Sequence, residues 1–332
     1  MRARRTIGSV ALTEMGLGTS TFGNLYRQTT DDQVEGAFAS SWAGGIRYFD
    51  TAPHYGLGLS EQRLGTLLRQ HPRDEVIVSS KVGRILEPSP DTADRADAQG
   101  FAVPAATVRR FDFSRDGILR SIEESLLRTG LDRFDVLYLH DPEDHWEQAA
   151  TSGISTLIEL RDQGVVSAVG AGMNYAAPLA ELIRRADVDL VMIAGQMTLL
   201  EHAAFGDLLP LALDRGVGIV AAGVYNSGIL GRDRPVPDAK FNYADAPTET
   251  IVRADLLATI CEAHGVSLPV AAIAYPLLHP AVASVVLGAR DSAQAVGNLA
   301  RYRTPVPDAL WSELQDAGLI PEISTDPSER TP

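Results

Sequence analysis

Short apolar or β-branched runs alternate along this chain with longer stretches in which apolar residues recur at helical spacing. Such alternation is typical of repeated strand–helix units, so we expect a parallel sheet covered by helices. The predicted strands are residues 15–19, 47–50, 76–81, 134–140, 167–172, 190–196, 218–225 and 284–289. The predicted helices are residues 31–43, 60–69, 116–129, 152–163, 177–185, 205–215, 249–264 and 292–301. Because each of these eight strands is followed by a helix, the pattern favours an α/β fold of the closed (β/α)8 TIM-barrel type over an open doubly wound sheet.

Two long polar stretches interrupt this alternation, at residues 83–113 and 229–248. Both follow the end of a predicted strand, where the active-site loops of a barrel lie, and we expect them to be irregular loops. No Gly/Ser-rich linker divides the chain, which predicts a single domain over residues 1–332. Helix ends are predicted at four glycines, namely Gly130, Gly164, Gly216 and Gly265.

Composition narrows the class of partner. The 332 residues are 45% hydrophobic and carry a formal net charge of −14. A sizeable core is therefore expected, and nucleic acid is not an expected partner, since nothing would neutralise its phosphates. One cysteine, Cys261, excludes an internal disulfide and suits a reducing compartment. No apolar run reaches the length of a signal or membrane-spanning segment, so we expect a cytoplasmic monomer or small homo-oligomer that acts on a small molecule, with no membrane partner.

Four titratable residues fall at the ends of neighbouring predicted strands: Asp50, Tyr55, Lys81 and His140. In a barrel these ends gather on one face, which carries the chemistry. Lys81 closes an apolar run, and a buried ammonium needs a carboxylate, which Asp50 on the adjacent strand supplies. A cation beside the phenol is expected to lower the pKa of Tyr55, so that it exchanges a proton with an alcohol or carbonyl. His140 is then expected to orient the substrate oxygen.

Each of these residues also has a structural explanation when it is taken alone. Asp50 precedes Ala-Pro as a turn residue does, and Tyr55 sits where a rim residue would cover the barrel. Lys81 suits a solvated strand end, and His140 precedes an Asp-Pro turn. Together, however, four titratable groups at consecutive strand ends favour an acid–base site over packing. The other histidines show no i, i+4 pair, so no metal is expected.

The motif DTAPHYG (50–56), followed by SE (60–61) and LG (64–65), with Lys81 and His140 downstream, resembles the aldo-keto reductase superfamily over nearly the whole chain. The resemblance implies a (β/α)8 barrel that binds a nicotinamide dinucleotide without a Rossmann domain. It also implies that Asp50, Tyr55, Lys81 and His140 form a catalytic tetrad, in which Tyr55 is the general acid in reduction and the base in oxidation. The implied cofactor contacts are Gly18, Thr19, Asp50, Asn174, Gln196, Tyr225, Gly288, Arg290, Gln294 and Asn298.

Cofactor preference follows from the residues after the eighth predicted strand. The family's NADP-preferring members often place a pair of cations there to hold the 2′-phosphate, whereas Arg290 is the only cation close by in this sequence. Gly297 stands where an acid is often found, and Gly172-Met173-Asn174 keeps only the Asn of the usual Ser-Asn pair. We therefore expect NAD or NADP as the cofactor, leaning to NAD.

Two further segments, TSTFGNLYR (19–27) and VYNSGILG (224–231), resemble the branch that contains D-threo-aldose and L-fucose 1-dehydrogenases and pyridoxal 4-dehydrogenase. This resemblance implies oxidation of a cyclic hemiacetal to a lactone, with an aldose as the first expectation. Pyridoxal 4-dehydrogenase and a general aldehyde or ketone reductase are alternatives, and a non-catalytic nicotinamide-binding subunit is ranked last. The pocket walls are expected from residues 24–27, 83–113, 145–146 and 226–245.

Overall fold

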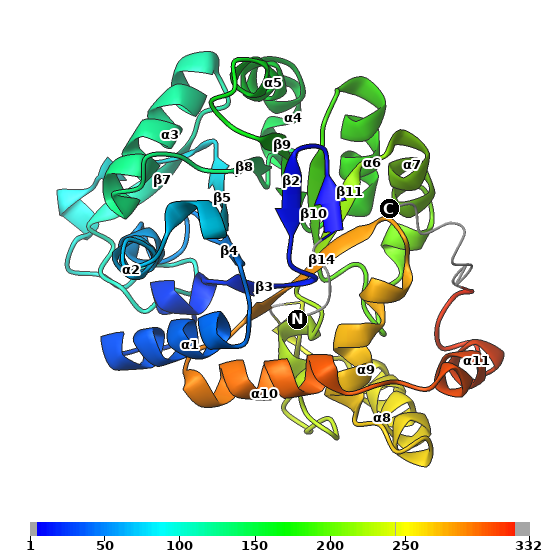
Figure 1. Ribbon diagram of the computed structural model, residues 1–332. Coiled ribbons are helices and arrows are strands. Elements are labelled where there is room, and N and C mark those ends of the chain that lie inside the picture. The colour runs from blue at the N-terminus through cyan, green and yellow to red at the C-terminus, as the bar shows by residue number, and fades with distance from the viewer. Residues whose placement is uncertain (1–4, 243, 323–332) are drawn as a thin grey trace.

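Eight parallel strands close into a barrel in this computed structural model, which describes residues 5–242 and 244–322 (Figure 1). The barrel strands are β3 (Met15–Gly18), β4 (Tyr48–Asp50), β5 (Ile77–Val82), β8 (Val136–His140), β9 (Ala168–Met173), β10 (Leu190–Ala194), β11 (Gly218–Ala222) and β14 (Val282–Gly288). They follow one another around the barrel in chain order, and β14 pairs with β3 to close it. The predicted (β/α)8 fold is confirmed.

Helices surround the barrel at the predicted places (Figure 1). They are α1 (Asp31–Ala43), α2 (Leu59–Leu68), α3 (Arg115–Thr129), α5 (Ile154–Asp162), α6 (Ala176–Arg185), α7 (Leu208–Arg215), α8 (Thr248–Ala263) and α10 (Ser292–Arg303). The left-handed backbone that ends α3 and α7 lies at Gly130 (φ 65°) and Gly216 (φ 67°), as predicted.

Strand periodicity decides which side chains enter the barrel, because successive residues of a strand point to opposite faces. In β4 and β8, Phe49, Leu137 and Leu139 pack with the surrounding helices in one core cluster. Tyr48 and Tyr138 belong instead to the cluster inside the barrel. The residues two positions further on, Asp50 and His140, therefore point inward at the carboxyl end of the barrel. On β5, Ser79 and Lys81 share this side, since Ser79 Oγ lies 2.7 Å from Asp50 Oδ1.

A hairpin of β1 (Arg5–Ile7) and β2 (Val10–Leu12), not predicted, covers the opposite end of the barrel. Its Val10 and Leu12 join the interior cluster, and Ser9 Oγ donates to Ser167 O, which directly precedes β9. Figure 1 shows this hairpin lying across the barrel. The mouth at the carboxyl ends of the strands is therefore the end left for a site.

The two stretches expected to be irregular contain paired strands, so that expectation was wrong. Within 83–113, β6 (Arg84–Pro88) and β7 (Thr107–Phe111) form an antiparallel ladder. Within 229–248, β12 (Lys240–Phe241) pairs with β13 (Ala244–Asp245). These strands were missed because they are short and polar residues interrupt them without a regular period; in β7 every residue remains at least partly exposed.

Three helices were also not predicted: α4 (Trp146–Gln148), α9 (Leu268–Ala274) and α11 (Asp308–Asp316). Six of the seven residues of α9 are buried, so its sequence has no polar face to reveal a helical period. Within the described residues no single helix is long and apolar enough to cross a membrane. The pair Thr248–Ala263 and Leu268–Leu278 has that length and composition only when taken together across a 94° bend.

Candidate active site

The four predicted catalytic residues meet at the mouth of the barrel. Lys81 stands at their centre: its Nζ donates to Asp50 Oδ2 at 2.7 Å and to Tyr55 Oη at 3.0 Å. The third ammonium proton goes to Thr51 O at 3.1 Å. The side chains of Lys81 and Asp50 are each only 3% exposed. Because every donor of this buried ammonium has an acceptor, the arrangement keeps a charge that burial alone would make too costly.

Asp50 is held on its other side as well. Its Oδ1 accepts the Ser79 hydroxyl at 2.7 Å, and the same hydroxyl lies 3.1 Å from Tyr48 Oη. Burial lowers the pKa of Lys81, but Asp50 and Tyr55 outweigh this and leave the pKa raised above its ordinary value. Lys81 is therefore a permanent cation at working pH, and Asp50 is its fixed counter-ion.

The pKa of Tyr55 shifts in the direction opposite to our prediction. Burial of the phenol raises its pKa, the Lys81 ammonium lowers it, and the Asp50 carboxylate raises it again, so that the net pKa lies above its ordinary value. The prediction counted the cation but not the loss of water or the nearby carboxylate, which partly cancels the cation's field. Tyr55 is therefore a protonated phenol at neutral pH, ready to donate.

His140 faces Tyr55 edge-on, with ring centroids 6.0 Å apart and ring planes at 89°. Burial, together with the charges of Arg84 and Lys81, holds the pKa of His140 well below its ordinary value. The imidazole is therefore neutral and acts as a hydrogen-bonding group, not as an acid. Among the described residues its buried Nδ1 has no hydrogen-bond partner.

Asp141, which directly follows His140, was missed by sequence reasoning. Its carboxylate pairs with Arg84 and accepts a hydrogen bond of 3.4 Å from Asn174 Nδ2. Its backbone has a φ of 40°, a left-handed conformation that residues other than glycine seldom adopt and that clusters at functional sites. The signal in the sequence was its adjacency to His140, which we attributed to a turn.

His54 was also missed, although it lies inside the DTAPHYG motif. Its ring centroid is 5.4 Å from that of His140 and 5.9 Å from that of Tyr55. Arg109 donates to the His54 carbonyl at 2.9 Å and pairs with Asp97 at 2.6 Å. The site therefore contains a second imidazole, whose backbone is anchored from the long loop.

The two predicted wall segments 24–27 and 83–113 meet over these rings. Tyr26 N donates to Gly100 O at 2.7 Å, and Ala102 N donates to Asn24 O at 2.9 Å. Between these contacts Phe101, 3% exposed, places its ring centroid 5.1 Å from that of His54 and 6.2 Å from that of Tyr55. The long segment therefore lies beside the four residues, as an active-site loop does.

The predicted cofactor residues lie around the same mouth. Gly18 and Gly288 are paired in register where β3 and β14 end. Asn174 and Gln196 follow the adjacent strands β9 and β10, and Tyr225 follows β11. Side-chain amides at neighbouring strand ends suit the donor and acceptor of a nicotinamide carboxamide, so the residues present fit this group.

Several of these residues are already hydrogen-bonded within the protein. Thr19, fully buried, places its Oγ1 2.8 Å from Asp50 O and 2.7 Å from Ser60 Oγ, so its side chain braces the motif. Asn298 Nδ2 donates to Gly288 O at 3.1 Å, and Tyr225 Oη lies 3.4 Å from Asn298 Oδ1. The Gln294 side chain accepts the Arg290 N–H at 2.9 Å.

Arg290 is not the isolated cation that the sequence indicated. Its guanidinium donates to Arg27 O at 3.0 Å and to Leu25 O at 2.7 Å, and it also bonds Thr29 Oγ1. Burial lowers the pKa of Arg290, and the charge of Arg27 lowers it further. The fold therefore places a second, exposed cation, Arg27, beside Arg290, although the two are far apart in the sequence. Arg290 itself holds the loop that contains Arg27.

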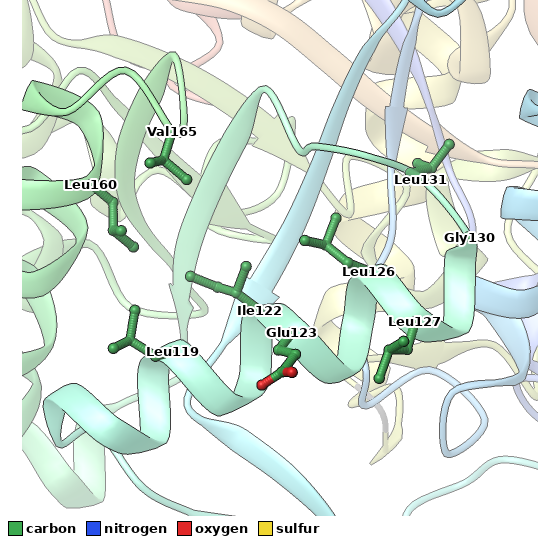
Figure 2. Close-up of a pocket in the computed structure, with 9 residues that line it drawn as sticks. All are labelled: Leu119, Ile122, Glu123, Leu126, Leu127, Gly130, Leu131, Leu160 and Val165. Carbon is green, nitrogen blue, oxygen red and sulfur yellow. The ribbon is translucent and has the colours of Figure 1, made fainter.

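An apolar groove of about 490 Å³ lies elsewhere, on the outer surface between α3 and the segment that joins α5 to β9 (Figure 2). Leu126, Leu131 and Val165 line it near the amino ends of β8 and β9, away from the mouth. Glu123 is the one titratable residue in its lining. The groove therefore holds no pair of titratable groups that could act together as acid and base.

Comparison with known proteins agrees with the fold. Residues 14–318 match the Aldo/keto reductase family. The chain is 44% identical over 315 residues to D-threo-aldose 1-dehydrogenase of Pseudomonas sp, which covers 94% of this chain and 96% of that protein. It is 36% identical over 344 residues to pyridoxal 4-dehydrogenase of Microbacterium luteolum, which covers 96% of this chain and 98% of that protein.

Among solved structures, the holo form of an aldo-keto reductase from Bacillus halodurans superposes with a TM-score of 0.73 over 99% of both chains at 23% identity, which shows the shared fold. The chain therefore belongs to the aldo/keto reductase family and is an NAD(P)-dependent oxidoreductase that acts on CH–OH or carbonyl groups.

Proposed function

We propose that this enzyme oxidises the anomeric carbon of an aldose hemiacetal to a lactone, with Asp50, Tyr55, Lys81 and His140 as its catalytic residues. The observation that carries the proposal is the Tyr55 phenol bonded to a buried ammonium, 3.0 Å from Lys81 Nζ and edge-on to the neutral imidazole of His140. The relative at 44% identity, D-threo-aldose 1-dehydrogenase, supports an aldose as the substrate class.

The proposed mechanism divides the work among these side chains. The C1 hydroxyl of the sugar lies between Tyr55 Oη and His140, and His140 orients it by a hydrogen bond. Lys81 stabilises Tyr55 as phenolate, which takes the proton of the hydroxyl. The C1–O bond becomes the lactone carbonyl, and the C1 hydrogen leaves with its bonding electrons as hydride. A bound nicotinamide dinucleotide supplies the hydride acceptor. Asp50 keeps Lys81 charged and in place throughout.

The raised pKa of Tyr55 sets the pH dependence of each direction. Oxidation starts from the phenolate, so its rate rises with pH above neutral. Reduction of a free aldehyde starts from the phenol, which is the form present at neutral pH, and is favoured at lower pH.

Pyridoxal is the second candidate substrate, favoured by the 36% identity to pyridoxal 4-dehydrogenase. Pyridoxal forms an internal hemiacetal, so the same residues would act on it without change of role. Initial rates with L-fucose, D-arabinose, pyridoxal and simple aldehydes, each with NAD and NADP, separate the candidates. We expect aldose oxidation to have the largest kcat/KM and its product to be a lactone. A pyridoxal rate above every aldose would contradict the proposal, and absence of all turnover would indicate a binding subunit.

A further inference from the structure

Some of the buried polar atoms that lack a partner lie beside the catalytic residues. Among the described residues, His54 Nδ1, His140 Nδ1 and Arg84 Nε are buried and have no hydrogen-bond partner. A buried polar atom without a partner costs free energy, and a catalytic or ligand-binding role is one reason for which native proteins keep it. His140 Nδ1 and Arg84 Nε belong to residues already engaged with Tyr55 and Asp141, whereas His54 has no role in the chemistry described above.

The position of His54 is determined from several sides. Its ring centroid lies 5.1 Å from that of Phe101, at an angle of 86°, and 5.4 Å from that of His140, at 78°. Its carbonyl accepts a hydrogen bond from Arg109, whose guanidinium forms a second bond to Asp97, at 3.1 Å, besides the shorter one already described. Both side chains of that ion pair are 5% exposed or less. The imidazole is therefore packed in place beside the reacting groups.

The charge state of His54 follows from the same surroundings. Burial lowers its pKa, the nearby charges of Arg84, Arg109 and Lys81 lower it further, and the pKa falls to about 2. At any working pH the ring is neutral, with one nitrogen as donor and the other as acceptor. Such a ring suits a hydroxyl group, which both donates and accepts, better than a charged group.

We propose that His54 is a specificity-determining residue, whose Nδ1 binds the substrate hydroxyl on the carbon next to the one that reacts. This inference rests on the proposed function. The reacting oxygen lies between Tyr55 and His140, and the ring of His54 flanks both. Hydroxyl oxygens on adjacent carbons of a sugar are about as far apart as two hydrogen-bonded atoms, so one substrate reaches both imidazoles at once. A substrate that lacks the second hydroxyl leaves Nδ1 unpaired and is disfavoured.

The test compares substrates that differ only in this hydroxyl. L-fucose is paired with 2-deoxy-L-fucose, and D-arabinose with 2-deoxy-D-ribose, which is D-arabinose without its 2-hydroxyl. For the wild type we expect kcat/KM to favour the hydroxylated member by about 10- to 100-fold. In His54→Leu the ratio should fall to within about threefold of unity, chiefly through loss of rate on the hydroxylated sugar. His54→Asn places an amide near the position of Nδ1 and should restore part of the ratio.

One control variant and three control measurements separate recognition from a structural role. His264→Leu removes a histidine that pairs with Glu313 on the outer helices and should leave the ratio unchanged. Binding of NAD and NADP, followed by fluorescence, should be the same in all variants, as should the melting temperature within a few degrees. Since His54 stays neutral, the pH profile of kcat/KM for the deoxy sugar should keep its midpoint in His54→Leu.

An unchanged ratio in His54→Leu, or an equal loss on both members of a pair, would overturn the assignment. If the wild type oxidises no aldose, the proposed function fails by itself. The same contact is then tested by reduction of glyceraldehyde against propanal, in which the wild type should prefer the hydroxyaldehyde and His54→Leu should not.

Discussion

Replacement of Lys81 by methionine tests the electrostatic basis of the proposed chemistry. Lys81 Nζ lies 3.0 Å from Tyr55 Oη. Two unit charges at that separation attract by about 5 kcal/mol at an effective dielectric constant of about 20. The Asp50 carboxylate remains in the variant. Its repulsion of the Tyr55 phenolate, which raises the pKa of Tyr55, is then no longer offset by the Lys81 ammonium. At about 1.4 kcal/mol per pKa unit, loss of this attraction should raise the pKa of Tyr55 by about 4 units.

The assay is the pH dependence of kcat/KM for aldose oxidation. Below the pKa, the phenolate fraction falls tenfold for each unit by which the pKa rises, so kcat/KM for oxidation by Lys81→Met should fall about ten-thousandfold at pH 8. The rising limb of its profile should move to alkaline pH, whereas reduction measured at acidic pH, which starts from the phenol, should lose much less.

A double variant distinguishes catalysis from stability. Lys81→Met alone leaves the buried Asp50 carboxylate without its cation, which should lower the melting temperature. Adding Asp50→Asn removes that unpaired charge and should restore much of the stability without restoring oxidation. An oxidation profile of Lys81→Met with an unshifted midpoint would refute the assignment of the titrating group to Tyr55.

Three further predictions follow from the same geometry. Tyr55→Phe should keep the fold and cofactor binding but lower kcat by about 10²- to 10⁴-fold, and a variant that retains most of its turnover would remove Tyr55 from the acid–base role. NAD should bind within about tenfold of NADP or better, a difference in binding free energy of about 1.4 kcal/mol at most. In fluorescence titrations, Arg27→Ala should weaken the binding of NADP more than that of NAD. Arg290→Ala releases the loop 25–29 and should weaken the binding of both cofactors. The pKa of His54 is about 2 in the folded protein and about 6.5 in the unfolded chain. Between about pH 2 and pH 6.5 the imidazole therefore binds a proton only in the unfolded chain, so the free energy of unfolding should fall as pH drops below about 6.5. Melting temperatures from pH 7 to pH 5 should fall less steeply in His54→Asn, and equal slopes would show that His54 is not the group responsible.

Local patterns in the sequence were sufficient for the barrel and its catalytic end. Strand identity follows from short apolar runs, and the alternation of residues along a strand then places Asp50, Lys81 and His140 on one side of the sheet. Because the carboxyl ends of parallel strands share one face of a barrel, the meeting of these residues with Tyr55 needed no knowledge of packing. The apolar helix α9 and the polar strand β7 were missed because their residues show no helical or strand period.

What the tertiary structure alone decided depends on contacts between segments far apart in the chain. The pKa of Tyr55 is raised because the effects of burial and of Asp50 together outweigh that of Lys81. The direction of this shift depends on all three in the assembled site, and no single neighbour predicts it. Arg27 reaches Arg290, and Phe101 reaches His54, only because loops from different strands close over one mouth. Sequence order records which side chains follow each strand, whereas the distances that set their charge and their partners exist only once the barrel has closed.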